Sequence, residues 1–250
     1  MAGPDASSRT ARYRQAIRLP RAMEDWEFTS VLISRPVGFL LLHVLEPLSF
    51  VTPNLITLLG FFCFLGASVL LAQAPQATWA IALLLFLRLI FDDLDGMLAR
   101  VRGAGSHFGS YLDKITDVLG FFAFFTVLGW TAAIREGALW PLALSSAGVC
   151  ALVTTGYVKW VVRGMEPVPV ATSVDASPAP RRHPAMVFTI LLVRLFGVNE
   201  CDIFLLSIVL VLLGLTAPLL WVLSLSQIAL CLAMIVKRGW RARQLDRLQG

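Results

Sequence analysis

Residues 203–236 read IFLLSIVLVLLGLTAPLLWVLSLSQIALCLAMIV, a stretch without a single charged side chain. A helix needs about 20 apolar residues to cross the hydrocarbon core of a bilayer. Pro218, in the middle of this stretch, removes a backbone hydrogen-bond donor and clashes with the preceding helical turn. We therefore expect two membrane-spanning helices here, separated at Thr216-Ala217-Pro218.

The composition of the whole chain agrees with a membrane protein. Of 250 residues, 57% are hydrophobic and 15% are charged, against about 45–50% and about 25% in soluble domains. This balance excludes a soluble globule, a disordered chain and a disulfide scaffold. The four cysteines occur singly, without the paired spacing of a zinc or redox motif, and are expected to fill the core: Cys63, Cys150, Cys201 and Cys231.

Four more apolar stretches have the length of a spanning helix: Leu55–Ala72, Trp79–Ala99, Val118–Ile134 and Ala138–Val158. A shorter one, Val37–Phe50, contains His43 and Glu46 and is expected to lie in the interface plane of the membrane. The predicted fold class is an all-α integral membrane protein with six transmembrane helices, preceded by an N-terminal interfacial amphipathic helix.

The chain divides into three parts on this interpretation. Residues 1–52 form a cytoplasmic N-terminus with the interfacial helix, residues 53–237 the six-helix catalytic domain, and residues 238–250 a basic cytoplasmic tail. The proline-rich stretch Glu166–Pro184 is expected to be a loop. Met186–Leu195 is too short to cross, and either lies on the membrane surface or extends the fifth helix.

Lysine and arginine are distributed unevenly over the two sides of this topology. Nineteen of the 21 lysines and arginines fall on the side that holds both termini, Arg135 lies on the other, and Arg88 lies within a span. Because cytoplasmic loops are enriched in basic residues, both termini are expected in the cytoplasm. This bias and attraction to anionic lipids account for the net charge of +5 without nucleic-acid binding.

Two pairs of aspartates stand where the second and third spans meet. Asp92 and Asp95 are three residues apart near the cytoplasmic end of the second span. Asp113 and Asp117 are four residues apart at the cytoplasmic start of the third. Each spacing places a pair on one helix face, and the connection at about residues 101–108 makes the helices antiparallel neighbours. All four carboxylates are expected to converge, and such oxygen-only ligands suit a pair of hard divalent cations.

Small residues beside these aspartates predict a pocket. Arg100 is placed to grip a phosphate at its mouth, and Ser106 to donate a hydrogen bond to one. The positions that would clear the space are Gly96, Ala99, Gly103, Gly105 and Gly109. Metals, a pocket and an arginine together predict a diphosphate site.

The motif Asp92-x-x-Asp95-Gly96-x-x-Ala99-Arg100, followed after eight residues by Gly109-x-x-x-Asp113-x-x-x-Asp117, resembles the complete signature of the CDP-alcohol phosphotransferase (CDP-alcohol phosphatidyltransferase) family. Pro53-Asn54-x-x-Thr57 at the start of the first span resembles that family as well. The resemblance implies transfer of a phosphoalcohol group, above all phosphatidyl, from a CDP-linked donor to an acceptor hydroxyl, with release of CMP.

The same resemblance implies roles for individual residues. Asp92, Asp95, Asp113 and Asp117 would hold two divalent cations, Mg²⁺ or Mn²⁺, and Asp117 would also be the base. The contacts to the donor nucleotide would be Asn54, Thr57, Gly96, Ala99, Arg100, Ser106 and Gly109. The donor would be CDP-diacylglycerol or a CDP-linked polar alcohol. A homodimer is also implied, and the aromatic run Phe121–Phe125 would belong to its contact or face lipid.

The acceptor alcohol is left open by the sequence. Inositol phosphate or glycerol phosphate would need cations, and Lys159, Arg163 and Arg194 lie on the correct side. A neutral acceptor such as serine or diacylglycerol would not need them. The lipid can arrive on either the donor or the acceptor.

Other interpretations compete at several positions. Pairing of the aspartates with Arg88 or Lys114 is the structural alternative to metal binding. Asp93 points about 100° away from Asp92 and is expected to have a structural, solvated or arginine-paired role. Two other function classes use intramembrane acids: a membrane prenyltransferase acting on a prenyl diphosphate, and a divalent-cation transporter.

Overall fold

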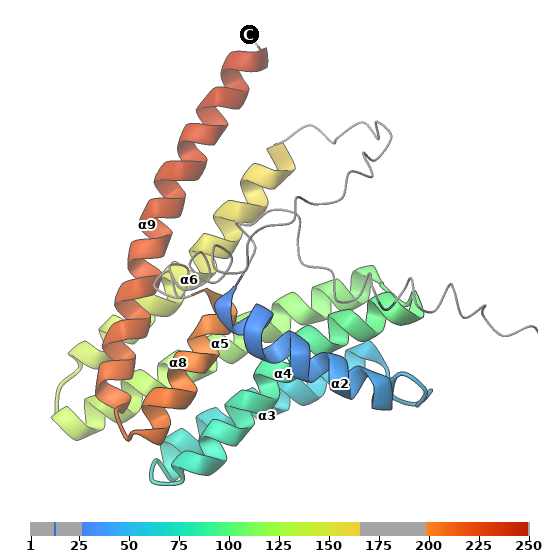
Figure 1. Ribbon diagram of the computed structural model, residues 1–250. Helices are drawn as coiled ribbons and strands as arrows, with labels where there is room; N and C mark the ends of the chain where they lie inside the picture. The colour runs from blue at the N-terminus through green and yellow to red at the C-terminus, as the bar shows by residue number, and fades with distance from the viewer. Residues whose placement is uncertain (1–12, 14–26, 166–198, 250) are drawn as a thin grey trace, which may run out of the picture.

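The computed structural model describes residue 13, residues 27–165 and residues 199–249, and every element within them is a helix (Figure 1). In chain order the elements are η2 (Ser30–Ser34), α2 (Arg35–Leu45), α3 (Pro53–Gln73), α4 (Thr78–Arg102), α5 (His107–Glu136), α6 (Trp140–Met165), α8 (Glu200–Leu212) and α9 (Thr216–Gln249). The predicted all-α class is confirmed for these residues. Met186–Leu195 and the loop Glu166–Pro184 lie outside the described residues.

Four of the described helices, α3, α5, α6 and α9, are long and apolar enough to cross a membrane, as in a multi-pass membrane protein. The α4 helix has 25 residues but carries six charged side chains, Arg88, Asp92, Asp93, Asp95, Arg100 and Arg102, and the described part of α8 has 13 residues. The count of six spans therefore stays a prediction.

The break in the apolar stretch at 203–236 lies slightly earlier than the proline. The α8 helix ends at Leu212, and Gly214 adopts a positive φ of 70° in the turn that follows. The α9 helix then starts at Thr216, so that Pro218 lies in its first turn, where no intrahelical donor is lost. This helix continues to Gln249, and the basic residues after 237 extend it.

The N-terminal helix differs from its predicted bounds. Helical structure runs from Ser30 to Leu45 instead of from Val37 to Phe50. Leu42 on its inner side is fully buried in a cluster with Leu94 and Met97 of α4, whereas Leu40 and other apolar residues of its outer side are exposed. An interfacial position in the membrane stays a prediction, but the inner side of this helix is part of the protein core.

An aromatic cluster joins α3, α5 and α8. The Phe64 ring lies 5.3 Å from Phe121, 5.4 Å from Phe124 and 4.9 Å from Phe204, between centroids. Phe121, Phe124 and Phe125 are at most 2% exposed. The expectation that the run Phe121–Phe125 faces lipid or a second subunit is therefore wrong for these three residues, because the core of one chain already covers them.

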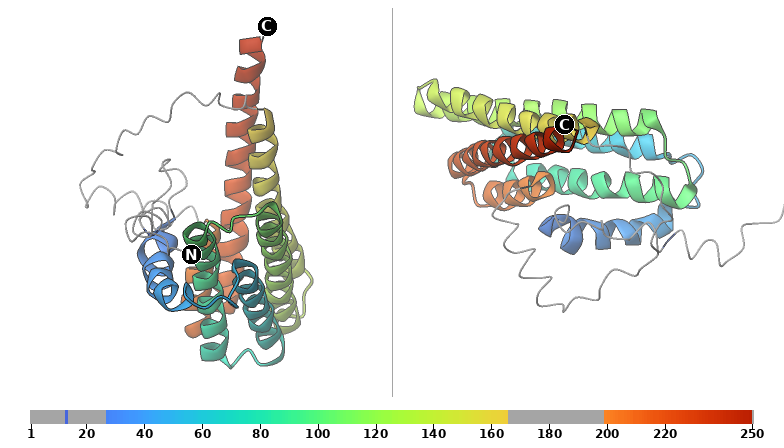
Figure 2. Two further views of the ribbon diagram at one scale, coloured as in Figure 1. Left: turned by 90° about the vertical axis from the view of Figure 1, so that its right-hand side faces the viewer. Right: turned by 90° about the horizontal axis from the view of Figure 1, so that it is seen from above.

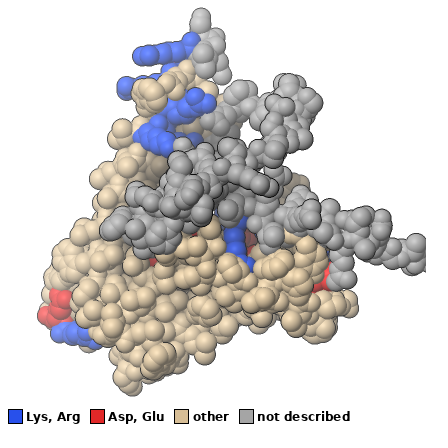
Figure 3. Space-filling view, viewed as in Figure 1, with Lys and Arg blue, Asp and Glu red and all other residues tan. Residues whose placement is uncertain are grey.

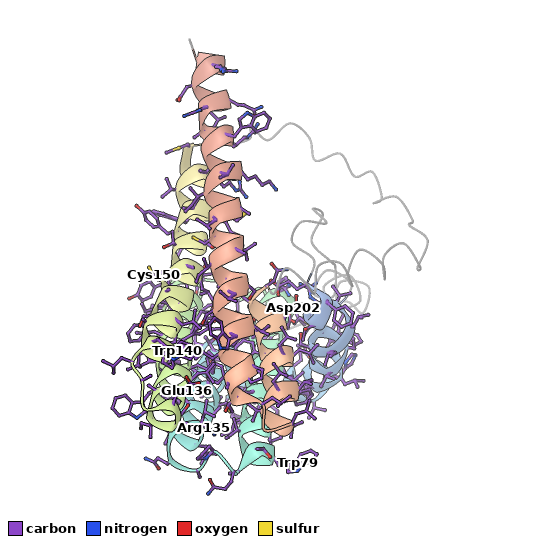
Figure 4. The ribbon with its side chains drawn as sticks, turned by 90° about the vertical axis from the view of Figure 1, so that its left-hand side faces the viewer. Trp79, Arg135, Glu136, Trp140, Cys150 and Asp202 are labelled. Carbon is purple, nitrogen blue, oxygen red and sulfur yellow. The ribbon has the colours of Figure 1, made fainter. Side chains whose placement is uncertain are left out.

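The helix connections gather at two ends of the molecule. At one end, which Trp79, Arg135 and Glu136 mark, α4 starts and α5 ends (Figure 4). Asp202, at the start of α8, lies toward the other end of the molecule (Figure 4). At that opposite end α3 begins, α4 ends and α5 begins. The C-terminal part of α9 projects beyond the other helices (Figure 2), and lysine and arginine gather on it while most of the visible helical body is uncharged (Figure 3).

Candidate active site

The turn between α4 and α5 brings the two pairs of aspartates together. Gly103 closes α4 with a positive φ of 63°, a backbone conformation that glycine adopts without strain. Ser106 caps α5, and its hydroxyl accepts a hydrogen bond from the Gly109 amide at 2.9 Å. With both helix ends fixed by so short a connection, Asp92 of α4 lies beside Asp113 and Asp117 of α5.

Three carboxylates form one group. Asp92, Asp113 and Asp117 each offer an oxygen atom, and the three atoms lie within 4.8 Å of one another. Oxygen ligands on opposite sides of one Mg²⁺ ion stand about 4.2 Å apart, which is twice the metal–oxygen distance. The donor set and its spacing therefore fit a hard divalent cation.

Asp95 stands apart from this group. Its side chain is buried, and its Oδ2 accepts a hydrogen bond of 2.5 Å from the Thr57 hydroxyl of α3. Asp95 lines a cavity together with Asp113. The expected convergence of all four carboxylates is thus found for three, because Thr57 holds the fourth toward the neighbouring helix.

Two cations lie among the carboxylates. Arg88, whose side chain is 4% exposed, binds Asp92 Oδ1 through Nη1 at 2.8 Å and Asp117 Oδ1 through Nη2. Lys114, which is 71% exposed, places Nζ 3.1 Å from Asp113 Oδ2 and 3.5 Å from Asp117 Oδ2. The structural alternative to metal binding, pairing of the aspartates with Arg88 and Lys114, is therefore present in the structure. Arg88 contacts one oxygen atom of each aspartate that it pairs with.

Asp93 points away from this group, as predicted. Its Oδ1 lies 3.3 Å from Arg35 Nε, and its Oδ2 accepts hydrogen bonds from the hydroxyls of Ser30 (2.8 Å) and Ser34. Asp93 thereby ties η2 and α2 to α4. The predicted structural, arginine-paired role is confirmed.

A cavity of about 540 Å³ opens beside Asp95 and Asp113. Its wall comes from the start of α3, the end of α4, the connection after α4 and the start of α5. All seven residues that the sequence assigns to the nucleotide line this cavity: Asn54, Thr57, Gly96, Ala99, Arg100, Ser106 and Gly109.

Two glycines let polar side chains of the cavity wall approach the backbone closely. A Cβ atom on Gly96 would lie 3.2 Å from Arg100 Nη1, so the guanidinium group lies directly over this glycine. A Cβ atom on Gly109 would lie 3.1 Å from both Asn54 Oδ1 and Ser106 Oγ. A larger residue at either position would push polar groups of the wall from their places.

Lys159 is the suggested acceptor contact whose side chain the structure describes. It is exposed on α6 and does not line the cavity. Arg163 belongs to the last turn of α6, and Arg194 lies outside the described residues.

Several contacts near the site are not evident from the sequence. Arg102 donates hydrogen bonds to the carbonyl oxygens of the turn between α2 and α3, at Leu45 (2.9 Å), Glu46 (2.8 Å), Leu48 (2.8 Å) and Val51. Glu27 accepts a hydrogen bond of 3.2 Å from the Cys201 amide at the start of α8, and burial raises the pKa of Glu27 to about 7. The Cys201 thiol in turn lies 4.0 Å from Asp92 Oδ2. No local motif marks these residues, since their partners are distant in sequence.

Curated relatives are similar to part of the chain. A phosphatidylinositol phosphate synthase of Corynebacterium glutamicum is 34% identical over 111 residues, which are 44% of this chain and 49% of that protein. Another, of Mycolicibacterium smegmatis, is 31% identical over 131 residues, 52% of this chain and 55% of that protein. The chain spans about half the length of these curated relatives.

A solved structure shares the fold. The crystal structure of Mycobacterium tuberculosis phosphatidylinositol phosphate synthase with CDP-DAG bound aligns with a TM-score of 0.50 at 20% sequence identity. The alignment covers 85% of this chain and 93% of that chain.

The sequence model of CDP-alcohol phosphatidyltransferases matches residues 50–236. This range is well over half of the chain, and it includes all four aspartates and every residue that lines the cavity. The chain therefore belongs to the CDP-alcohol phosphatidyltransferase family.

Proposed function

We propose that this protein is a divalent-metal-dependent phosphotransferase that moves a phosphatidyl group from CDP-diacylglycerol to an alcohol and releases CMP. The observation that carries the proposal is the cavity, because all seven expected nucleotide contacts lie in its wall. The cavity also adjoins the cluster of three aspartates on α4 and α5. Family membership favours this reaction over prenyl transfer or cation transport.

The side chains divide the work of this reaction. Asn54, Arg100 and Ser106 are placed to bind the nucleotide and its diphosphate in the cavity. Asp92, Asp113 and Asp117, with Asp95 beside them, would hold the Mg²⁺ or Mn²⁺ ions, two in number on our proposal. The ions would supply charge neutralisation of the diphosphate and of the departing CMP.

Asp117 is the proposed base. It takes the proton of the acceptor hydroxyl, whose oxygen forms a bond to the phosphorus distal to cytidine. The bond from that phosphorus to the CMP oxygen breaks, and CMP leaves with the electron pair. A carboxylate within hydrogen-bond reach of the hydroxyl is sufficient for this proton transfer.

The placement in the membrane is part of the proposal. The helices α3, α4, α5, α6, α8 and α9 would be the six spans, with both termini and the cavity on the cytoplasmic side. The distribution of lysine and arginine along the sequence supports this orientation. The proposed acceptor carries a phosphate group, as the names of the relatives suggest. A homodimer, which the family resemblance of the sequence implies, completes the proposal.

The test is release of CMP by the purified chain with Mg²⁺ or Mn²⁺ and CDP-diacylglycerol. The acceptor panel is inositol phosphate, glycerol phosphate, serine and diacylglycerol, and one of the first two is expected to support release. Asp117→Asn should abolish release while the chain stays folded. Full turnover by Asp117→Asn would show that Asp117 is not the base. If no acceptor supports CMP release, with CDP-diacylglycerol or with CDP-choline as the donor, the proposed reaction is refuted.

A further inference from the structure

Arg88 is an arginine in an apolar part of α4, and it is only 3% exposed. A buried guanidinium group is costly unless charged partners and hydrogen bonds compensate for its lost hydration. Arg88 has such partners on two helices: Nη1 binds Asp92 Oδ1 of α4, and Nη2 binds Asp117 Oδ1 of α5. Its two nitrogen atoms therefore join two carboxylates of the group that fits a metal ion.

The guanidinium group of Arg88 is itself held in place by two more helices. Its central carbon lies 5.6 Å from the centroid of the Phe204 ring of α8. On the α3 side, a Cβ atom on Gly60 would lie 3.4 Å from Nη1, so the α3 backbone passes close to the guanidinium group. Four helices thus fix the position of one fork-shaped cation.

We infer that Arg88 is a positioning residue of the metal centre. It holds Asp92 and Asp117 through Oδ1 of each carboxylate, so that the cation would bind their Oδ2 atoms, which lie 4.0 Å from the Cys201 thiol and 3.5 Å from Lys114 Nζ, respectively. The inference rests on the proposed function in assigning a divalent cation to these carboxylates. Groups that orient metal ligands in this way commonly change metal affinity about 10- to 100-fold when they are replaced.

The charges of the group agree with this role. Arg88 and Lys114 are paired with Asp92, Asp113 and Asp117. With Asp95 included, two of the four negative charges are left uncompensated, which is the charge of one divalent ion in the chain without donor. The second ion of the proposed pair would be balanced by the diphosphate of the donor. Lys114 differs from Arg88 because it is a flexible, exposed point charge, whereas the planar fork of arginine fixes the direction of two carboxylates.

Arg35 offers a matched comparison. It forms an ion pair with Asp93, the direct neighbour of Asp92, but on the side of α4 that faces α2. Arg35→Lys and Arg88→Lys therefore make the same chemical change beside adjacent aspartates. Both keep the positive charge and remove the fork.

The experiment is titration of the full chain in detergent with Mn²⁺ and without any CDP-linked donor, with free Mn²⁺ measured by electron paramagnetic resonance. Asp113→Asn first identifies the Mn²⁺ binding that depends on the cluster of Asp92, Asp113 and Asp117. Arg88→Lys is expected to weaken this binding about 10- to 100-fold, and Arg35→Lys to change it less than twofold. Phe204→Leu, which removes the ring beside the guanidinium group, is expected to weaken it as well.

Wild-type affinity in Arg88→Lys would overturn the inference, and so would equal losses in Arg88→Lys and Arg35→Lys. If Arg88→Lys does not fold, Phe204→Leu decides, and unchanged affinity in that variant also overturns the inference. The outcome is separate from the proposed reaction. Mn²⁺ binding that depends on Arg88 in a chain that never releases CMP would refute the reaction and leave the role of Arg88 intact.

Discussion

Thr57 shows how one hydroxyl arranges a site. It lies one turn after the start of α3 and lines the cavity. Its hydroxyl lies 3.2 Å from the Pro53 carbonyl oxygen of its own helix and donates a hydrogen bond to Asp95 of α4 at 2.5 Å. Asp95 is the carboxylate that stands outside the group of three. The hydroxyl therefore determines where the fourth carboxylate points, in addition to the contact with a nucleotide that the sequence suggests.

Thr57→Val should destabilise the protein by about 1–3 kcal/mol, because it leaves a buried carboxylate oxygen without its donor. The measurement is the melting temperature in detergent, together with the KM for the CDP-linked donor, which should rise. Thr155→Val is the control, since that buried hydroxyl bonds the Ala151 carbonyl of its own helix at 2.9 Å. Equal effects of the two substitutions would contradict the special role of Thr57.

Spacing along a helix predicted much of the site at this scale. The intervals between Asp92 and Asp95 and between Asp113 and Asp117 set their faces by helix geometry alone, and the same geometry turned Asp93 away. The second partner of Arg88 and the bond from Thr57 to Asp95 were not predictable. Both depend on which side chains of a distant helix arrive at the same point.

At the scale of elements, Arg102 connects three helices. It is the last residue of α4, and its guanidinium group donates to the carbonyl oxygens that follow the end of α2 and precede α3. Carbonyl groups at the C-terminal end of a helix lack intrahelical donors and attract a cation. Arg102 thus fixes the turn from which α3, and with it the wall of the cavity, begins.

Arg102→Gln should lower the stability by on the order of 1–2 kcal/mol, because charge-assisted hydrogen bonds to several carbonyl groups are lost. Faster hydrogen exchange at residues 46–52 and a lower melting temperature would report this loss. Arg135→Gln is the matched control, because that exposed arginine makes a hydrogen bond of 3.4 Å to Thr216 at the far end of the molecule. Unchanged exchange at 46–52 in Arg102→Gln would contradict the prediction.

Glu27 connects the segment before η2 to α8 and makes their contact depend on pH. Its pKa is about 7 in the folded protein, against 4.5 in the unfolded chain, chiefly because burial disfavours the carboxylate and further because Glu200 and Asp202 are near. Between these pH values the folded state binds more protons than the unfolded state, so stability falls as pH rises through about 7.

Glu27→Gln should flatten the decline of the melting temperature between pH 5 and pH 8, since a neutral amide has no proton to lose. Glu136→Gln, at the exposed end of α5, should keep the slope of the wild-type protein. A Glu27→Gln variant with the wild-type slope would show that another group causes the decline.

Element bounds were predictable where composition changes abruptly, and less so elsewhere. The start of α3 follows from Thr52 and Pro53, a capping residue and a proline at the first helical position. The N-terminal helix was predicted too late in the sequence, because Pro36 indicates a helix boundary, whereas this proline lies in the first turn of α2 and helical structure precedes it in η2. The hydroxyls of Ser30 and Ser34 bond Asp93 of α4, and this tertiary contact stabilises the helical structure before the proline.

Charged residues outside the site gather at the two ends of the whole molecule. The projecting end of α9 carries lysine and arginine, whereas Arg135 and Glu136 lie at the opposite end of the body (Figures 3 and 4). A helix of 34 residues is about 51 Å long, against about 30 Å of hydrocarbon. We therefore expect the charged last third of α9 to lie outside the membrane.

Cysteine labelling tests the orientation of the whole chain. A cysteine placed at Glu136 should react with a membrane-impermeant maleimide in intact cells, because that turn is expected on the outer side. A cysteine placed at Asp246 should react only after permeabilisation. Both positions are exposed, and the reverse pattern would invert the proposed topology.

The cavity wall is drawn from a short part of the chain, since every residue that lines it falls between Pro53 and Asp113. The helices α6 and α9 pack against each other and add nothing to that wall among the described residues. Recombination between homologous genes at the α5–α6 turn would thus pass on the complete cavity wall as a single block. On our proposal, chimaeras joined near residue 137 would exchange the rest of the chain and keep the same donor.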